Sequence, residues 1–99
     1  MLWYIVNMRA NKVDGNQSQI VKELRELGFS VLLLNSVKGG CPDILVGTSD
    51  GYNLLVEVKI DSGKLNKLEE EFFDNWKGEI IVARNTEEIL DKLNHMRGL

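Results

Sequence analysis

The sequence has few of the residues that build disulfides or zinc sites. Its 99 residues include a single cysteine, Cys41, and a single histidine, His95. One cysteine cannot form an internal disulfide, and the two residues lack the number and spacing of zinc ligands. No histidine lies near Cys41 in the sequence to activate a thiol nucleophile, so we interpret it as a small packed residue. This cysteine usage fits a reducing, cytoplasmic environment.

Long apolar runs are also missing. The strongly apolar stretches are only a few residues long, far short of the roughly 20 that a membrane-spanning helix needs. The N-terminal stretch MLWYIV is apolar, but it lacks the basic start and small-residue cleavage site of a signal peptide. The sequence therefore predicts neither a membrane span nor a secretory signal.

An excess of positive charge is absent as well. The formal net charge is −3, whereas proteins that bind nucleic acids usually carry a basic surface. The acidic excess lies in residues 69–99, which hold eight acidic and four basic residues, whereas residues 36–68 hold four of each. Net charge alone thus leaves DNA open as a partner for the middle of the chain.

The chain has the size and patterning of one α/β domain. With 43% hydrophobic residues it can bury a modest core. Helical or strand-like spacing of apolar residues predicts the order α-β-β-β-α-β-α, a mixed sheet flanked by helices. The expected elements are helices at 17–27, 66–76 and from Asn85 onward, and strands at 29–35, 43–48, 52–60 and 79–84. Asn85 and Glu88, three residues apart, predict a capping box at the start of the last helix. We expect a single domain over 1–99, with a core at 14–97 and an N-terminal extension at 1–13.

Three charges interrupt two of these apolar strands. Asp43 opens the strand in GGCPDILVG, and Glu57 and Lys59 lie two apart in NLLVEVKI, so they share a face. If Ser49, Asp50 and Gly51 form a three-residue hairpin loop, Asp43 falls opposite Glu57 on that face. A two-residue Asp-Gly turn would instead place the two carboxylates on opposite faces.

Two facing carboxylates are unfavourable unless something holds them together, and a divalent cation does this well. Mg²⁺ prefers oxygen ligands and binds through one or two carboxylates plus substrate phosphate. Lys59 would then orient an attacking water and stabilise developing negative charge. In the alternative interpretation, Asp43 caps a loop, and Glu57 and Lys59 form an ordinary surface ion pair.

Four segments together resemble the VRR-NUC family of virus-type replication-repair nucleases, a branch of the Pro-Asp…(Asp/Glu)-x-Lys superfamily. They are DGNQSQIVKELRELGFSV, GGCPDILVG, LLVEVK and KLNKLEEEFFDNWKGEIIVAR, and the similarity runs from about Asp14 to about Leu93. Archaeal Holliday-junction resolvases are more distant relatives. The resemblance implies a restriction-endonuclease-like fold that cuts DNA with Mg²⁺ or Mn²⁺ in a bacterial or phage-infected cell.

The resemblance also assigns roles to residues. Asp43 and Glu57 match the family's metal ligands, Lys59 matches its catalytic lysine, and the Val58 carbonyl would complete the metal shell. Gln17 stands where the family's first helix commonly carries an acidic residue near the metal, so it is a candidate catalytic residue whose amide could hold a metal-bound water or the substrate. Glu69 stands where a glutamine often follows the motif. Because Gln17 adds no negative charge, it would weaken metal affinity or reduce the number of bound ions.

Residues around the motif form a possible DNA surface. Lys38, Lys64 and Lys67 could contact phosphates, and Ser36 could either do so or cap its loop. Gly39 and Gly40 would allow a tight turn or a close backbone approach to DNA.

The aromatic residues of the second predicted helix need a partner surface. Leu68, Phe72, Phe73 and Trp76 recur on one face, which predicts core or dimer packing. A domain this small offers little DNA-binding surface, so we expect a homodimer acting on a junction, flap or nicked DNA.

Two other functions remain open at this point. The first is a DNA-binding module that keeps the fold but has little or no activity, which Gln17 and the acidic net charge favour. The second is an interaction subunit whose carboxylates merely pair with lysines.

Overall fold

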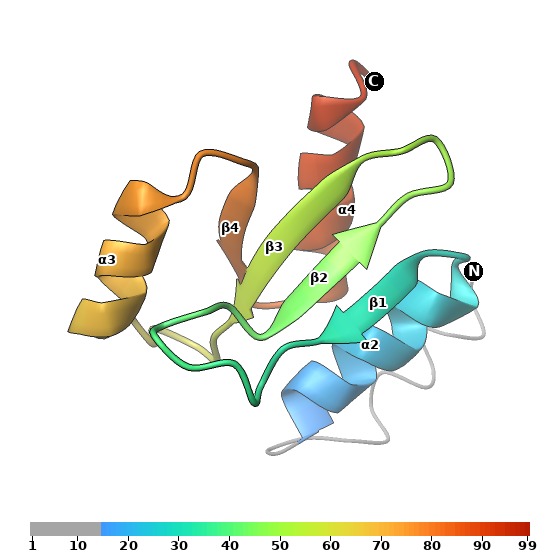
Figure 1. Ribbon diagram of the computed structural model, residues 1–99. Coiled ribbons are helices and arrows are strands. Elements are labelled where there is room, and N and C mark those ends of the chain that lie inside the picture. Colours follow the sequence, from blue (N-terminus) through green and yellow to red (C-terminus); the bar gives the residue numbers. More distant parts are fainter. Residues whose placement is uncertain (1–14) are drawn as a thin grey trace.

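The computed structural model describes residues 15–99, which form a four-stranded sheet with helices on both sides (Figure 1). The predicted extension at 1–13 lies outside the described residues. The elements are α2 (Gly15–Glu26), β1 (Ser30–Leu33), β2 (Ile44–Gly47), β3 (Asn53–Val58), α3 (Lys67–Asn75), β4 (Ile80–Ala83) and α4 (Thr86–Met96). Their order confirms the predicted α-β-β-β-α-β-α arrangement. None of the helices in this part of the chain is long and apolar enough to cross a membrane.

The sheet is mixed, as predicted. Its strand order is β1-β2-β3-β4, with antiparallel pairing of β1 to β2 and of β2 to β3. β3 and β4 pair in parallel, so the chain must cross over between them, and α3 lies on that crossover.

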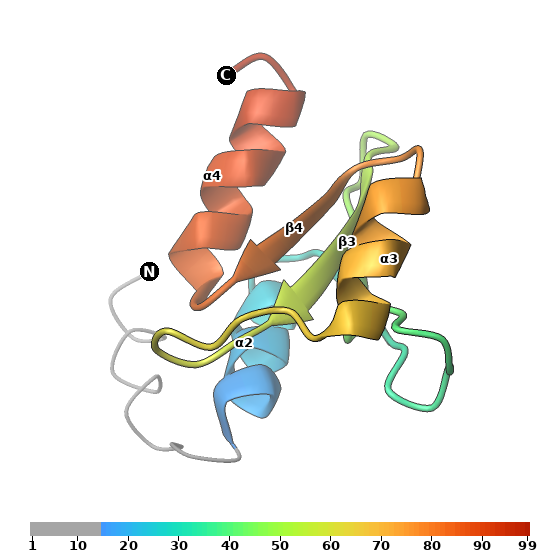
Figure 2. The same ribbon diagram turned by 90° about the vertical axis from the view of Figure 1, so that its left-hand side faces the viewer.

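The two sides of the sheet are covered differently. Figure 2 shows α2 and α4 on one side of β3 and β4, with α3 on the other. The core lies on the α2 and α4 side and contains Ile20, Val21, Leu24, Ile44, Val46, Leu54, Val56, Ala83, Ile89 and Leu93. Alternate residues of β3 therefore face the core, and those between them face the α3 side.

The hairpin between β2 and β3 has the predicted register. Gly47 pairs with Asn53 and Ile44 with Val56, so one further step places Asp43 opposite Glu57. The Thr48 amide donates to the Tyr52 carbonyl at 2.9 Å across the loop. Gly51 has a φ of +96°, a left-handed conformation that favours glycine. The three-residue loop is thus confirmed.

Both later helices begin with an asparagine cap. The Asn66 side chain accepts from the Glu69 amide, and the Glu69 carboxylate accepts from the Asn66 amide, which completes a capping box. At α4, the Asn85 side chain accepts from the Glu88 amide, as predicted. The Glu88 carboxylate, however, accepts from the Arg84 amide. The predicted box at Asn85 is therefore only half formed.

The aromatic residues of α3 are not buried in the core, although their spacing favours core packing. No residue of α3 is buried, and Leu68 and the capping residue Trp76 are 58% and 46% exposed. Phe72 stacks on Trp76 with ring centroids 5.4 Å apart. The alternative, packing against a second subunit, remains a prediction.

Candidate active site

Asp43 is fixed at the start of β2 by bonds to both neighbouring strands. Its carbonyl accepts from the Leu34 amide at 2.8 Å, which ties its backbone to the end of β1. Its side-chain Oδ2 accepts from the Val58 amide at 2.8 Å, at the end of β3. The carboxylate therefore points across the hairpin toward the segment that carries Glu57 and Lys59.

Glu57 is a buried carboxyl with too few partners. Its side chain faces the α3 side of the sheet, and the residue is only 4% exposed. Its Oε2 lies 3.4 Å from the Lys59 ammonium, whereas its buried Oε1 has no hydrogen-bond partner. Burial, together with the negative charges of Asp43 and Glu69, raises the pKa of Glu57 to about 8.

Lys59 is held by α3. Its Nζ lies 2.9 Å from Glu69 Oε1, the same oxygen that accepts from the Asn66 amide in the capping box. This contact raises the pKa of Lys59. Burial acts to raise the pKa of Glu69, but the Asn66 amide and Lys59 outweigh it and lower that pKa. Glu69 thus joins the site through Lys59.

Gln17 lies near the site, but its side chain hydrogen-bonds to Asn35. Gln17 Nε2 donates to Asn35 Oδ1 at 2.8 Å, and Asn35 Nδ2 donates back to Gln17 Oε1 at 3.2 Å. Asn35 Nδ2 also donates to Asp43 Oδ1 at 3.1 Å. Sequence reasoning missed Asn35, because an asparagine after a strand is typical of any turn.

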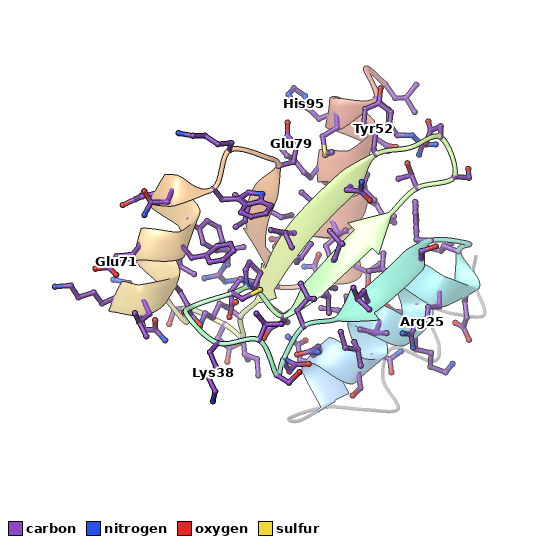
Figure 3. The ribbon with its side chains drawn as sticks, in the orientation of Figure 1. Arg25, Lys38, Tyr52, Glu71, Glu79 and His95 are labelled. Atoms are coloured by element: carbon purple, nitrogen blue, oxygen red, sulfur yellow. The ribbon has the colours of Figure 1, made fainter. Side chains whose placement is uncertain are left out.

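The predicted phosphate-contacting residues lie on the loops around this cluster. Lys38 and Ser36 are exposed on the loop between β1 and β2, and Figure 3 shows Lys38 extending outward from it. Lys64 and Lys67 are also exposed, just before and at the start of α3. All four are free to meet solvent, and none of them bonds to Asp43, Glu57 or Lys59.

The loop that carries Lys38 lies against α3. A Cβ added to Gly40 would lie 2.4 Å from the Leu68 carbonyl oxygen, so this loop needs glycine at its contact with the helix. Gly40 also has a φ of +81°. Close packing of this loop against α3 thus explains why position 40 is a glycine.

Cys41 lies beside the two carboxyls. Partial burial and the charges of Glu57 and Asp43 raise the pKa of its thiol. The thiol therefore stays protonated near neutral pH, which makes it a poor nucleophile.

The chemistry of the cluster fits a small divalent cation held by few protein ligands. Within residues 15–99, no group of three or more histidine, cysteine or acidic side chains is arranged to hold a metal ion. Two carboxylates remain, Asp43 and Glu57, and Mg²⁺ commonly uses one or two. A positive charge between them would also give the buried Glu57 Oε1 the partner that it lacks.

Comparisons with known proteins bear on the fold of the chain. No family model and no curated protein matches the chain. A solved structure described as a VRR_NUC domain matches it with a TM-score of 0.57 and 25% identity, over 80% of this chain and 90% of that one. The resemblance seen in the sequence is therefore confirmed in structure: the chain has the fold of a VRR-NUC nuclease domain.

Proposed function

We propose that this nuclease-like domain is a metal-dependent DNA endonuclease that hydrolyses phosphodiester bonds in branched, flapped or nicked DNA. The observation that carries the proposal is the buried Glu57, set among two acidic side chains beside Lys59. An interaction subunit would have no need for a buried carboxyl whose Oε1 lacks a partner. We expect it to act in the cytoplasm.

The proposed metal site uses Asp43, Glu57 and the Val58 carbonyl as ligands for Mg²⁺ or Mn²⁺. When bound, such a cation would polarise the scissile phosphate and stabilise charge on the leaving oxygen. The protein contributes rigidity, since Asp43 is anchored to both β1 and β3. It also buries Glu57, and electrostatic interactions are stronger in a site that excludes water.

Lys59 acts on the phosphate and the attacking water. Its ammonium is a donor only, so it orients the water through bonds to phosphate oxygens and stabilises their developing charge. The water oxygen forms a bond to phosphorus and releases a proton to solvent, while the bond to the 3′ oxygen breaks and that oxygen takes up a proton. The products are a 5′-phosphate and a 3′-hydroxyl. Glu69 keeps Lys59 charged and close to Glu57.

Basic residues on the surrounding loops position the DNA. We assign phosphate contacts to Lys38, Lys64 and Lys67, with Ser36 as a hydroxyl donor, because these residues are exposed around the carboxyl cluster. A homodimer would present two such sites to a branched substrate.

A second candidate is a DNA-binding module without useful activity. It is favoured by the amide of Gln17, which leaves the described site without an acidic group on α2. The two candidates differ in whether metal produces cleavage.

Cleavage of labelled junction, flap and duplex DNA in Mg²⁺, Mn²⁺ or EDTA at low salt tests the proposal. Glu57→Ala and Lys59→Ala should both abolish metal-dependent cutting, while Glu87→Ala, an exposed change on α4, should leave it unchanged. Binding without cutting, equal in all variants, would refute the endonuclease and support the second candidate.

A further inference from the structure

We infer that Asn35 is a positioning residue for Asp43, and that Gln17 acts on the site through Asn35. The inference rests on the proposed function, because it concerns the orientation of a proposed metal ligand. It differs from the role expected for Gln17 at the sequence level, which was direct contact with the metal surroundings.

The three side chains form a continuous chain of hydrogen bonds. Asn35 Nδ2 donates to Asp43 Oδ1 at 3.1 Å and to Gln17 Oε1 at 3.2 Å. Gln17 Nε2 donates to Asn35 Oδ1 at 2.8 Å. Both hydrogens of the Asn35 amide are thus used, one on the carboxylate and one on α2.

Asp43 determines which end of the Asn35 amide faces it, because a carboxylate only accepts, and Gln17 holds the amide in that orientation. An asparagine side chain can present either its oxygen or its nitrogen to a neighbour. The reciprocal pair with Gln17 binds both ends of the Asn35 amide, and in this arrangement its nitrogen faces the carboxylate. A flipped Asn35 would point its oxygen at Asp43 Oδ1 and repel it.

Asp43 is thereby held at both of its oxygens. Oδ2 accepts from the Val58 amide and Oδ1 from Asn35, so rotation of the carboxylate is restricted from two sides. Each carboxylate oxygen has about two acceptor positions, so both keep capacity for a cation. Residues that orient metal ligands in this way typically contribute about 10- to 100-fold to metal affinity or activity.

The positions of Gln17 and Asn35 in the fold fit these two roles. Gln17 lies in the first turn of α2, and Asn35 follows β1, which hydrogen-bonds to β2. The chain Gln17–Asn35–Asp43 therefore links the helix, the end of β1 and the start of β2. An acidic residue at position 17 could not donate to Asn35 Oδ1, so the amide is the side chain that this arrangement requires.

Mn²⁺ binding to the full chain without DNA, followed by electron paramagnetic resonance, tests the inference. Asn35→Ala should weaken Mn²⁺ binding about 10-fold, the lower end of the usual range, because Asn35 is exposed. Gln17→Ala should weaken it less, and the double variant should bind like Asn35→Ala alone, because Gln17 acts through Asn35. Asn94→Ala, an exposed change on α4, is the matched control.

Cleavage kinetics separate positioning from a general loss of structure. In Asn35→Ala the Mn²⁺ concentration for half-maximal cutting should rise, while the rate at saturating Mn²⁺ returns close to that of the wild type. Unchanged melting temperatures would show that both variants fold.

Three results would overturn the inference. They are wild-type Mn²⁺ affinity in Asn35→Ala, additive losses in the double variant, and a lost rate that saturating Mn²⁺ does not restore. Each leaves the proposed function standing if the wild type still binds metal and cuts DNA. A wild type that binds no Mn²⁺ would instead refute the proposed metal site, and the inference with it.

Discussion

Two buried glutamates in this small domain have opposite surroundings. Glu23 on α2 is 1% exposed, and Glu57 on β3 is 4% exposed. Glu23 accepts a short hydrogen bond from the Thr86 hydroxyl and one from Gln19 Nε2 at 3.0 Å. Glu57 has Lys59 at 3.4 Å on one oxygen, nothing on the other, and two acidic neighbours.

The difference separates a carboxyl with satisfied oxygens from the one that we propose as a metal ligand. Glu23 joins α2 to the start of α4, and both of its oxygens are satisfied. Glu57 is buried at a cost that its immediate neighbours do not offset, and such sites are kept where chemistry needs them. Burial alone therefore does not distinguish the two glutamates, whereas the unpartnered oxygen and the like-charged neighbours of Glu57 support its proposed role.

The largest expected effect separates the two glutamates by activity. Glu57→Gln should reduce cleavage about 1,000-fold, because it removes a proposed metal ligand and with it several kcal/mol of transition-state stabilisation. Glu23→Gln should cut at close to the wild-type rate, since the Glu23 carboxylate bonds to Thr86 and Gln19 and to none of the proposed site residues. Single-turnover cleavage at saturating DNA measures both. Equal losses of cleavage rate in Glu57→Gln and Glu23→Gln would show that the two glutamates do not differ in their effect on activity.

The next effect concerns competition between protons and metal. Because the pKa of Glu57 is raised to about 8, its carboxyl is mostly protonated below that pH, and a cation must displace the proton. The apparent Mn²⁺ affinity should therefore rise about 10-fold per pH unit between pH 6 and 8, and then level off. Calorimetric titrations in buffers of different ionisation enthalpy would also count the protons released. Affinity that stays flat over this range would contradict the raised pKa.

A smaller effect separates the glutamates by stability. Glu23→Ala should lower the free energy of unfolding by about 1–3 kcal/mol, because it leaves the Thr86 hydroxyl buried without this acceptor. Glu57→Ala removes the same atoms but also relieves the repulsion from Asp43 and Glu69, so its loss should be smaller. Urea unfolding at pH 8 in EDTA compares them. A larger loss in Glu57→Ala would mean that its surroundings stabilise the carboxylate.

Much of the fold could be predicted because local rules and tertiary structure agree. The order of elements follows from apolar spacing, and the β2–β3 register from one glycine-containing loop. That register was enough to bring Asp43 opposite Glu57. The incomplete burial of the aromatic face of α3 was not predictable, since spacing shows that residues share a face but not whether the protein covers it.

The rest of the site depends on contacts between distant segments. Asn35 reaches Asp43 and Gln17 only once β1 has paired with β2 and α2 has packed against the sheet. The three residues are too far apart in the sequence to form a short motif. Glu23 is a charged residue at a buried position of α2, which the spacing of apolar residues does not predict. Its partner Thr86 lies 63 residues further along the chain. The sequence shows where carboxylates are, but their partners decide which one is satisfied.

The last effect is a change in the pH dependence of stability without metal. The folded-state pKa of Glu57 is raised from 4.5 to about 8, so the native state holds a proton that the unfolded chain releases. Stability should therefore fall as pH rises from about 4.5 to 8, and the melting temperature should fall with it. The shifted groups Glu69 and Lys59 act outside this window, because the pKa of Glu69 is lowered from 4.5 and that of Lys59 is raised from 10.5. Glu57→Gln should flatten the slope. A slope that survives in Glu57→Gln would assign the proton to another group.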